Sequence, residues 1–173
     1  DHDVVIVGLG PTGATLANIL GEYGLDVVVL EREASVYPLP RAVHFDDEAM
    51  RVFQSIGLAE AIGRDARVNV GTKFVDSNMD LMLDWSRPQE IGPLGWHPSY
   101  RFHQPDLEAE LNRGIAARSN VTVTRSAEVS EVVDEGSQVR VAITQIGEKH
   151  SLTALYVVGA DGATHAGVYD IAF

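Results

Sequence analysis

A glycine pattern near the amino terminus is the first group of residues with recognisable chemistry. Gly8, Gly10 and Gly13 follow the spacing GxGxxG, and Pro11 and Thr12 lie between the last two. Between a strand and a helix, such a loop turns tightly, lets the backbone approach a pyrophosphate and packs the helix closely on the strand. The helix amino terminus adds N–H groups and the positive end of its dipole. The pattern therefore predicts a dinucleotide site.

An acidic residue stands where such a site needs one. Glu31 follows the apolar run 27–30, which we expect to be the second strand of the unit. A carboxylate there can accept hydrogen bonds from both hydroxyls of a ribose. The adjacent Arg32 is a second cofactor-binding candidate because it suits a 2′-phosphate, but Glu31 would repel that phosphate, which favours a plain surface charge. The fingerprint by itself leaves NAD and FAD open, since both contain adenosine diphosphate.

The secondary structure around these residues is predicted from the apolar periodicity. Residues 4–7 and 27–30 have the pattern of buried parallel strands, and a helix is expected from Pro11 to a stop at Gly24. Together they predict a complete β-α-β unit.

The rest of the chain is expected to contain further helices, an excursion and a meander. Helices are predicted from a cap at Asp46 or Asp47 to Gly57, over 59–62, and from Gln104 onward. Residues 66–103 have the pattern of short strands outside the nucleotide-binding layer, broken by prolines and glycines. A strand at 121–124 precedes three alternating runs that predict an antiparallel meander: 127–133, 138–146 and 151–158.

Composition narrows the class of partner. The 173 residues are 45% hydrophobic and 22% charged, as expected for one globular domain, and carry a net charge of −12. This charge disfavours nucleic acid and anionic membranes, and no apolar run approaches the ~20 residues of a membrane helix. We therefore expect neither nucleic-acid nor membrane partners. The sequence has no cysteine, which excludes disulfides and thiol chemistry within it and fits a cytoplasmic protein.

Other polar and aromatic residues have plainer explanations. The acidic run 46–48 is typical of the charge at a helix start, and we expect no metal site. Three histidines lack the spacing of ligands and are interpreted as surface or packing residues: His44, His97 and His103. Three aromatic residues fit either an aromatic-substrate pocket or core packing: Trp85, Trp96 and Tyr100.

Three further stretches carry a family resemblance. They are PRAVHFDDEA at 40–49, FHQPDLEAEL at 102–111 and GADG at 159–162. With the amino-terminal unit, this order resembles the single-component FAD-dependent aromatic hydroxylases of the para-hydroxybenzoate hydroxylase class. Within that class it is most similar to the 3-(3-hydroxyphenyl)propionate hydroxylase and phenol hydroxylase branch. The resemblance extends to about residue 163.

The resemblance implies an α/β fold. This is a Rossmann-like FAD/NAD(P)-binding fold with a parallel sheet, helices, an antiparallel β-meander crossover and part of a substrate-domain sheet. Residues 1–66 and 104–173 would form a discontinuous FAD-binding domain whose carboxyl-terminal part is missing, and residues 67–103 would begin the substrate-binding sheet.

The resemblance also implies roles for individual residues. The glycine motif would hold the FAD pyrophosphate, and Glu31 the adenosine ribose. Arg41 would reach the FAD phosphates or the ribityl side, since a guanidinium fork suits phosphate oxygens. Gln104 would bond the ribityl chain or the pyrophosphate, and Val129 would meet the adenine through its backbone. Asp161 would bind the ribityl chain or a phosphate-side hydroxyl and help to shape the NAD(P)H approach.

The implied function is an FAD-dependent, NAD(P)H-consuming monooxygenase of aromatic catabolism. It would hydroxylate a phenolic ring with O₂ through a flavin C4a-hydroperoxide. No side chain is a convincing acid or base for that step, so no catalytic residue is assigned. A disulfide-reducing flavoenzyme would need a cysteine pair, and the sequence has none.

Two alternatives stay open. A NAD-dependent dehydrogenase would share the first unit but predicts further β-α repeats in place of the meander. A truncated FAD- or ADP-binding module would bind without turnover. The residues leave open the ring substrate, the choice of NADH or NADPH, and whether the protein is a homo-oligomer.

The sequence departs from the family after Gly162. Residues 163–169 lack the serine and arginine that usually follow GADG in this family. Family members also run to several hundred residues, so we expect either a fragment or the ordered part of a longer chain.

Overall fold

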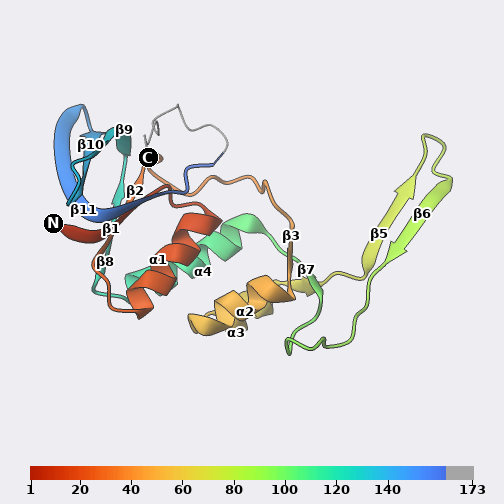
Figure 1. The fold of residues 1–173 in the computed structure, drawn as a ribbon. Coiled ribbons are helices and arrows are strands. Elements are labelled where there is room, and N and C mark those ends of the chain that lie inside the picture. Colours follow the sequence, from red (N-terminus) through yellow and green to blue (C-terminus); the bar gives the residue numbers. More distant parts are fainter. Residues whose placement is uncertain (163–173) are drawn as a thin grey trace. The chain divides into compact units, whose positions relative to one another are not determined.

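The computed structural model describes residues 1–162 (Figure 1). They fall into two compact units. Unit 1 comprises Asp1–Tyr37 and the chain from Leu111 onward, and unit 2 comprises Pro38–Glu110. No helix within residues 1–162 has the length and apolar character needed to span a membrane.

Unit 1 is built on a six-stranded sheet of mixed direction. Its strands are β1 (His2–Val7), β2 (Val27–Glu31), β8 (Val121–Arg125), β9 (Ala127–Asp134), β10 (Val139–Gln145) and β11 (Glu148–Gly159). The order is β8-β2-β1-β11-β10-β9. The strands β8, β2, β1 and β11 run parallel, and β10 and β9 continue the sheet antiparallel. The predicted parallel strands and meander are confirmed, with β11 starting earlier than expected.

Strand β11 belongs to both parts of this sheet. Its first half pairs with β10, and its second half, from Ala154 to Gly159, pairs with β1. The meander therefore returns the chain to the centre of the sheet without a crossover helix. A sheet that ends in two antiparallel strands differs from the all-parallel sheet that the dehydrogenase alternative predicts.

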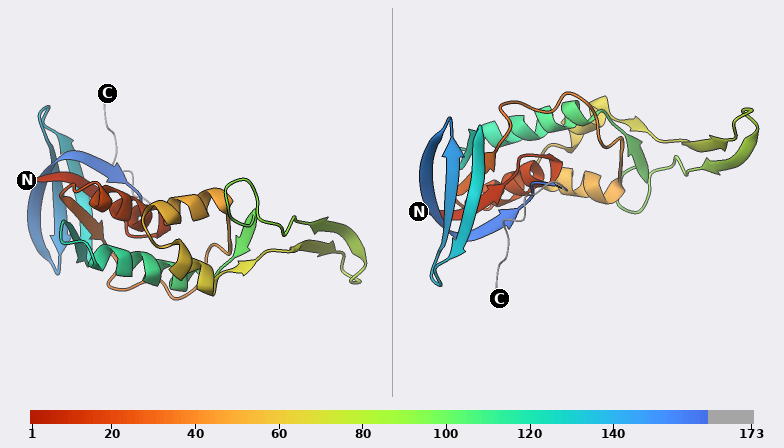
Figure 2. Two further views of the ribbon diagram at one scale, coloured as in Figure 1. Left: turned by 90° about the horizontal axis from the view of Figure 1, so that it is seen from below. Right: turned by 90° about the horizontal axis from the view of Figure 1, so that it is seen from above.

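The two faces of β1 and β2 are covered by different elements. Alternate residues share a face, and Val5, Val7, Val28 and Leu30 pack in one buried cluster with apolar residues of the meander. The opposite face contacts helix α1 (Pro11–Glu22). The two views of Figure 2 show α1 and the meander on opposite sides of the parallel strands. Burial on both faces explains why residues 4–7 and 27–30 are continuous apolar runs.

A buried polar network joins α1 to the end of helix α4 (Gln104–Ala116) within unit 1. Asn18 is fully buried, and its Nδ2 donates to the carbonyl oxygens of Ala14 and Leu111, each at 2.9 Å. The Arg118 guanidinium donates to Asn18 Oδ1 at 2.8 Å and to Glu22 Oε2 at 2.9 Å. Asn18 thus links α1 to α4 through its Nδ2, while its Oδ1 accepts from Arg118, which follows the end of α4.

Unit 2 combines helices with two small sheets. The helices are α2 (Asp47–Ser55), α3 (Ala59–Asp65) and the first part of α4. One sheet has the order β3-β7-β4, from β3 (His44–Asp46), β4 (Arg67–Val68) and β7 (Ser99–Arg101), and the other is the hairpin of β5 (Gly71–Val75) and β6 (Leu81–Ser86). Helix α2 is capped by Asp46, one of the two predicted caps, whose Oδ1 accepts from the Ala49 N–H at 3.0 Å.

The core of unit 2 is aromatic. Phe45 stacks on Tyr100 with ring centroids 5.3 Å apart and meets Phe53 edge-on at 5.6 Å. Tyr100 is buried, so of its two predicted roles the structure supports core packing. Trp85 lies on the hairpin and is 52% exposed, so it is not part of the core of unit 2. Trp96 donates through Nε1 to Gln54 at 3.1 Å.

Replacing Asn18 by leucine should destabilise unit 1. The variant leaves the Leu111 carbonyl and one Arg118 donor without the buried partner they have now, which costs about 2–3 kcal/mol of the free energy of unfolding. Urea denaturation measures this as a lower midpoint. Ser119→Ala, an exposed change nearby, should stay within about 0.5 kcal/mol of the parent. An unchanged midpoint for Asn18→Leu would contradict the assignment.

Candidate functional site

The glycine loop, residues 8–13, connects β1 to α1 and touches the end of β11 (Figure 1). The Ala160 N–H donates to the Val7 carbonyl at 2.7 Å, and Gly8 has a φ of +102°. A Cβ added to Gly8 would lie 2.5 Å from the Ala160 carbonyl oxygen and 2.8 Å from the Cα of Asp161. The structure therefore brings together Gly8 and Asp161, which come from opposite ends of the described chain.

The other two glycines of the motif differ sharply from each other. A Cβ on Gly13 would collide with the Gly8 carbonyl oxygen, so the packing of α1 on the loop requires glycine there. A Cβ on Gly10 would meet no atom within 4 Å, and this residue has an extended backbone with φ −70°. Nothing in the described part of the chain requires glycine at position 10. Its lack of a side chain leaves room for another molecule.

The amino terminus of α1 is open to an anion. Its cap residue is Gly10, no side chain hydrogen-bonds to the cap, and the first turn holds no acidic residue. Pro11 begins the helix, and the exposed Thr12 follows it. N–H groups at a helix start attract negative charge, and no carboxylate of the first turn competes for them. With the space beside Gly10, this arrangement fits a pyrophosphate.

Glu31 reaches back to the loop from the end of β2. Its Oε2 accepts from the Leu9 N–H and its Oε1 from the Glu33 N–H, each at 2.8 Å. A carboxylate has about four lone-pair sites, so these two bonds orient it and leave capacity for hydroxyl groups. Arg32 lies 3.4 Å from Glu33 through its Nε and has a mostly exposed side chain, which matches a surface charge.

Arg41 and Gln104 meet within unit 2. Gln104 is buried at the start of α4, and its Oε1 accepts from the N–H groups of Arg41 and Ala42, each at 2.8 Å. Its Nε2 donates to Glu108 Oε1 at 2.7 Å. Gln104 thus anchors the backbone that carries Arg41. Sequence reasoning named these two residues separately and missed Glu108, although the i, i+4 spacing in one helix was a usable signal.

The two remaining candidates lie in unit 1. Val129 is in β9, opposite Ile143 of β10, and packs against the buried cluster of the sheet. Asp161 follows β11 beside Gly8. Their roles toward a cofactor stay predictions, as do those of Arg41 and Gln104. The altered segment at 163–169 lies outside the described residues.

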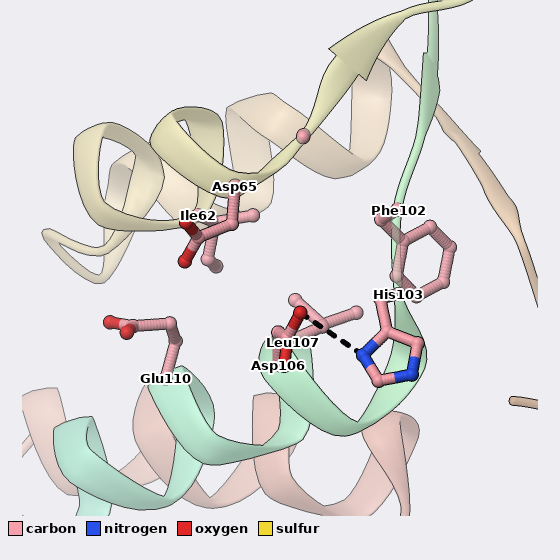
Figure 3. A pocket seen from close by; sticks show the side chains of 8 residues that line it. Ile62, Asp65, Phe102, His103, Asp106, Leu107 and Glu110 are labelled. Carbon is pink, nitrogen blue, oxygen red and sulfur yellow. Dashed lines mark ion pairs between the residues drawn. The ribbon is translucent and has the colours of Figure 1, made fainter. Parts of the chain in front are cut away.

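A small hollow in unit 2 lies between α3 and the start of α4 (Figure 3). Its lining includes Asp65, His103, Asp106 and Glu110, and His103 Nδ1 lies 3.0 Å from Asp106 Oδ2. Within residues 1–162, no cluster of three or more histidine and acidic side chains could hold a metal ion. None of the predicted cofactor-binding residues lines this hollow.

The histidines have ordinary partners in the structure. His44 Nε2 bonds Ser99 Oγ at 2.7 Å, and His97 Nδ1 bonds the Gln89 carbonyl at 2.6 Å. With the ion pair of His103, these contacts agree with surface and packing roles.

Comparisons with known proteins agree with this geometry. Residues 1–168 match the model of a family described as FAD binding domain. A protein of Rhodococcus jostii (strain RHA1) named "Probable NADH-specific resorcinol 4-hydroxylase" is 42% identical over 164 residues, which cover 92% of this chain and 30% of that protein. A "3-(3-hydroxy-phenyl)propionate/3-hydroxycinnamic acid hydroxylase" of Mycobacterium sp. (strain JLS) is 40% identical over 169 residues, covering 96% of this chain and 28% of that protein.

A solved structure shares the fold. The crystal structure of p-nitrophenol 4-monooxygenase PnpA from Pseudomonas putida DLL-E4 superimposes with a TM-score of 0.87 at 26% identity, covering 96% of this chain and 43% of that one. The chain thus spans under a third of the length of the two curated relatives named above.

The glycines provide a matched pair of substitutions. Gly8→Ala forces a side chain into a positive φ and against the Ala160 carbonyl, and should cost at least about 2 kcal/mol of the free energy of unfolding. Gly10→Ala should stay within about 0.5 kcal/mol of the parent but weaken FAD binding about tenfold or more, because the new methyl group lies in the space left beside the loop. Urea denaturation and titration calorimetry measure the two effects. Parental FAD affinity in Gly10→Ala would show that this space serves no ligand.

Proposed function

The chain belongs to the FAD-binding domain family, and from that premise we propose that it supplies the FAD-binding part of a monooxygenase that hydroxylates phenolic rings. The observation that carries the proposal is the glycine loop: an uncapped helix start, space beside Gly10, and a carboxylate already oriented against the loop. These features suit the two phosphates and the ribose of an adenosine diphosphate moiety.

The substrate class and the reductant come from the relatives. Proteins named as hydroxylases of resorcinol and of 3-(3-hydroxyphenyl)propionate share at least 40% of their matched residues with this chain. Their names support a phenolic ring as the substrate, and one of them favours NADH as the reductant. The monooxygenase that shares the fold supports O₂ as the oxidant. Because the chain spans 28–30% of these proteins, the complete activity is proposed for a protein that contains it.

Several of the predicted cofactor-binding residues are proposed to position FAD. The glycine loop with the start of α1 holds the pyrophosphate, and Glu31 holds the adenosine ribose. Asp161, whose backbone lies beside Gly8, is proposed to bind the ribityl chain or a nearby hydroxyl. The backbone of Val129 is proposed for the adenine side, and Arg41 for the phosphates or the ribityl chain. Bound FAD supplies the redox and oxygen chemistry, and the protein supplies binding and orientation.

Residues 67–103 are proposed to begin the substrate-binding sheet. Within them, the β5–β6 hairpin exposes large apolar side chains: Phe74, Val75, Leu81, Met82, Leu83 and Trp85. A hairpin of two strands has little stability by itself, and contiguous exposed apolar surface marks a contact region. Further strands beside this hairpin would give these side chains a buried environment.

Glu31→Gln tests the proposal at the ribose. The amide keeps the size of the side chain but removes the charge, and its single oxygen cannot serve both backbone N–H groups and the ribose. Loss of charge-assisted hydrogen bonds worth about 1.5–3 kcal/mol should weaken FAD and ADP binding roughly 10- to 100-fold. Titration calorimetry with both ligands measures this.

A neighbouring carboxylate is the control for Glu31. Glu33→Gln removes an exposed charge of the same segment, and FAD affinity should change less than about twofold. Riboflavin 5′-phosphate lacks the adenosine, so its binding should be equal in the parent and in Glu31→Gln. If Glu31→Gln bound ADP as tightly as the parent, Glu31 would have no role at the ribose.

A further inference from the structure

We propose that Glu108 is a positioning residue that fixes the amide of Gln104 and, through it, the backbone of Arg41 and Ala42. Glu108 and Gln104 are only 6% and 8% exposed. The Glu108 carboxylate receives the Gln104 Nε2 at 2.7 Å, and Gln104 Oε1 receives two backbone N–H groups at 2.8 Å. The part that concerns FAD rests on the proposed function.

The hydrogen-bonding capacity of the partners permits one orientation of the Gln104 amide. Backbone N–H groups only donate, and an ionised carboxylate only accepts. The Gln104 amide satisfies both kinds of partner by turning its oxygen to the N–H groups of Arg41 and Ala42 and its nitrogen to Glu108. Rotated by half a turn, it would set its NH₂ group against two N–H donors and its oxygen against the carboxylate. Glu108 therefore selects the orientation in which Gln104 can accept from the backbone of Arg41 and Ala42.

The segment at 32–43, which carries Arg41 and Ala42, has few regular contacts of its own. No helix or strand lies between Glu31 and His44, and Pro38 and Pro40 in that stretch carry no N–H group. Gln104 accepts from two successive N–H groups in this stretch, those of Arg41 and Ala42. The next residue, Val43, accepts through its carbonyl from the Phe102 N–H at 3.1 Å. These contacts tie the segment to α4 and the residues before it.

The position of the Arg41 guanidinium depends on this anchor. Arg41 is exposed, and its side chain extends from the Cα next to the backbone nitrogen that Gln104 holds. A long, flexible side chain finds a phosphate more readily when its Cα is fixed, because less conformational freedom is lost on binding. Glu108 has no expected contact with the cofactor, so its effect on FAD affinity would be transmitted through Gln104 and the segment that carries Arg41.

An exchange of the two side chains tests the proposal. Gln104→Glu places two carboxylates in contact and removes the donor between them, and should lower the protection of the Arg41 and Ala42 amides against hydrogen exchange about tenfold or more. FAD affinity should fall by a similar factor. The double variant Gln104→Glu/Glu108→Gln restores a donor–acceptor pair with reversed polarity, while the new carboxylate still accepts from both amides. Both quantities should return to within about threefold of the parent.

Rescue separates positioning from a merely structural role. If Gln104 and Glu108 acted independently of each other, the double variant would be at least as impaired as Gln104→Glu, and that result would overturn the proposal. Asp106→Asn is the control on the same helix, because its carboxylate is 56% exposed and faces His103. It should leave amide protection at Arg41 and Ala42 unchanged.

The two readouts keep the two proposals apart. Amide exchange is followed by NMR without any ligand, so rescue of protection supports the role of Glu108 even if no variant binds FAD. Absence of FAD binding in every form, including the parent, would contradict only the proposed function. Protection of both amides that is equal in all four forms would contradict the role of Glu108.

Discussion

The contact between the glycine loop and the end of β11 is the constraint on which unit 1 depends. At Gly8, the backbone of the loop approaches the Ala160 carbonyl so closely that no side chain fits, and the Ala160 N–H donates to Val7. This approach requires β11 to lie beside β1 in parallel register. It explains the long β11, whose first half belongs to the meander and whose second half delivers Asp161 to the loop.

Within the glycine loop, some glycines are required for folding and another is available for binding. Gly8 and Gly13 are needed by the chain's own packing, whereas Gly10 has open space beside it. Glu31 is already held by two backbone N–H groups, one of them in the loop. A site whose polar groups are oriented before the ligand arrives loses less freedom on binding. The amide of Gln104 has a comparable place in unit 2, since it is buried and has partners at both its oxygen and its nitrogen.

The sequence predicted the elements that are long and strongly patterned. The strands at 4–7 and 27–30, the helix from Pro11 and the meander follow from apolar periodicity, and the glycine spacing located the loop. Strands β3 and β7 were not predicted, because three residues carry too little alternation to recognise. The partnership of Gln104 with Arg41 and Ala42 also escaped prediction, because it joins residues far apart in the chain. No local pattern encodes such a contact.

Calorimetric titration of the purified protein with FAD and, separately, with NAD, followed by competition with ADP, tests most directly whether the glycine loop is part of an FAD site. One FAD should bind per chain, ADP should displace it, and NAD should bind much more weakly. Binding of NAD with no binding of FAD would contradict an FAD site and would favour the dehydrogenase alternative.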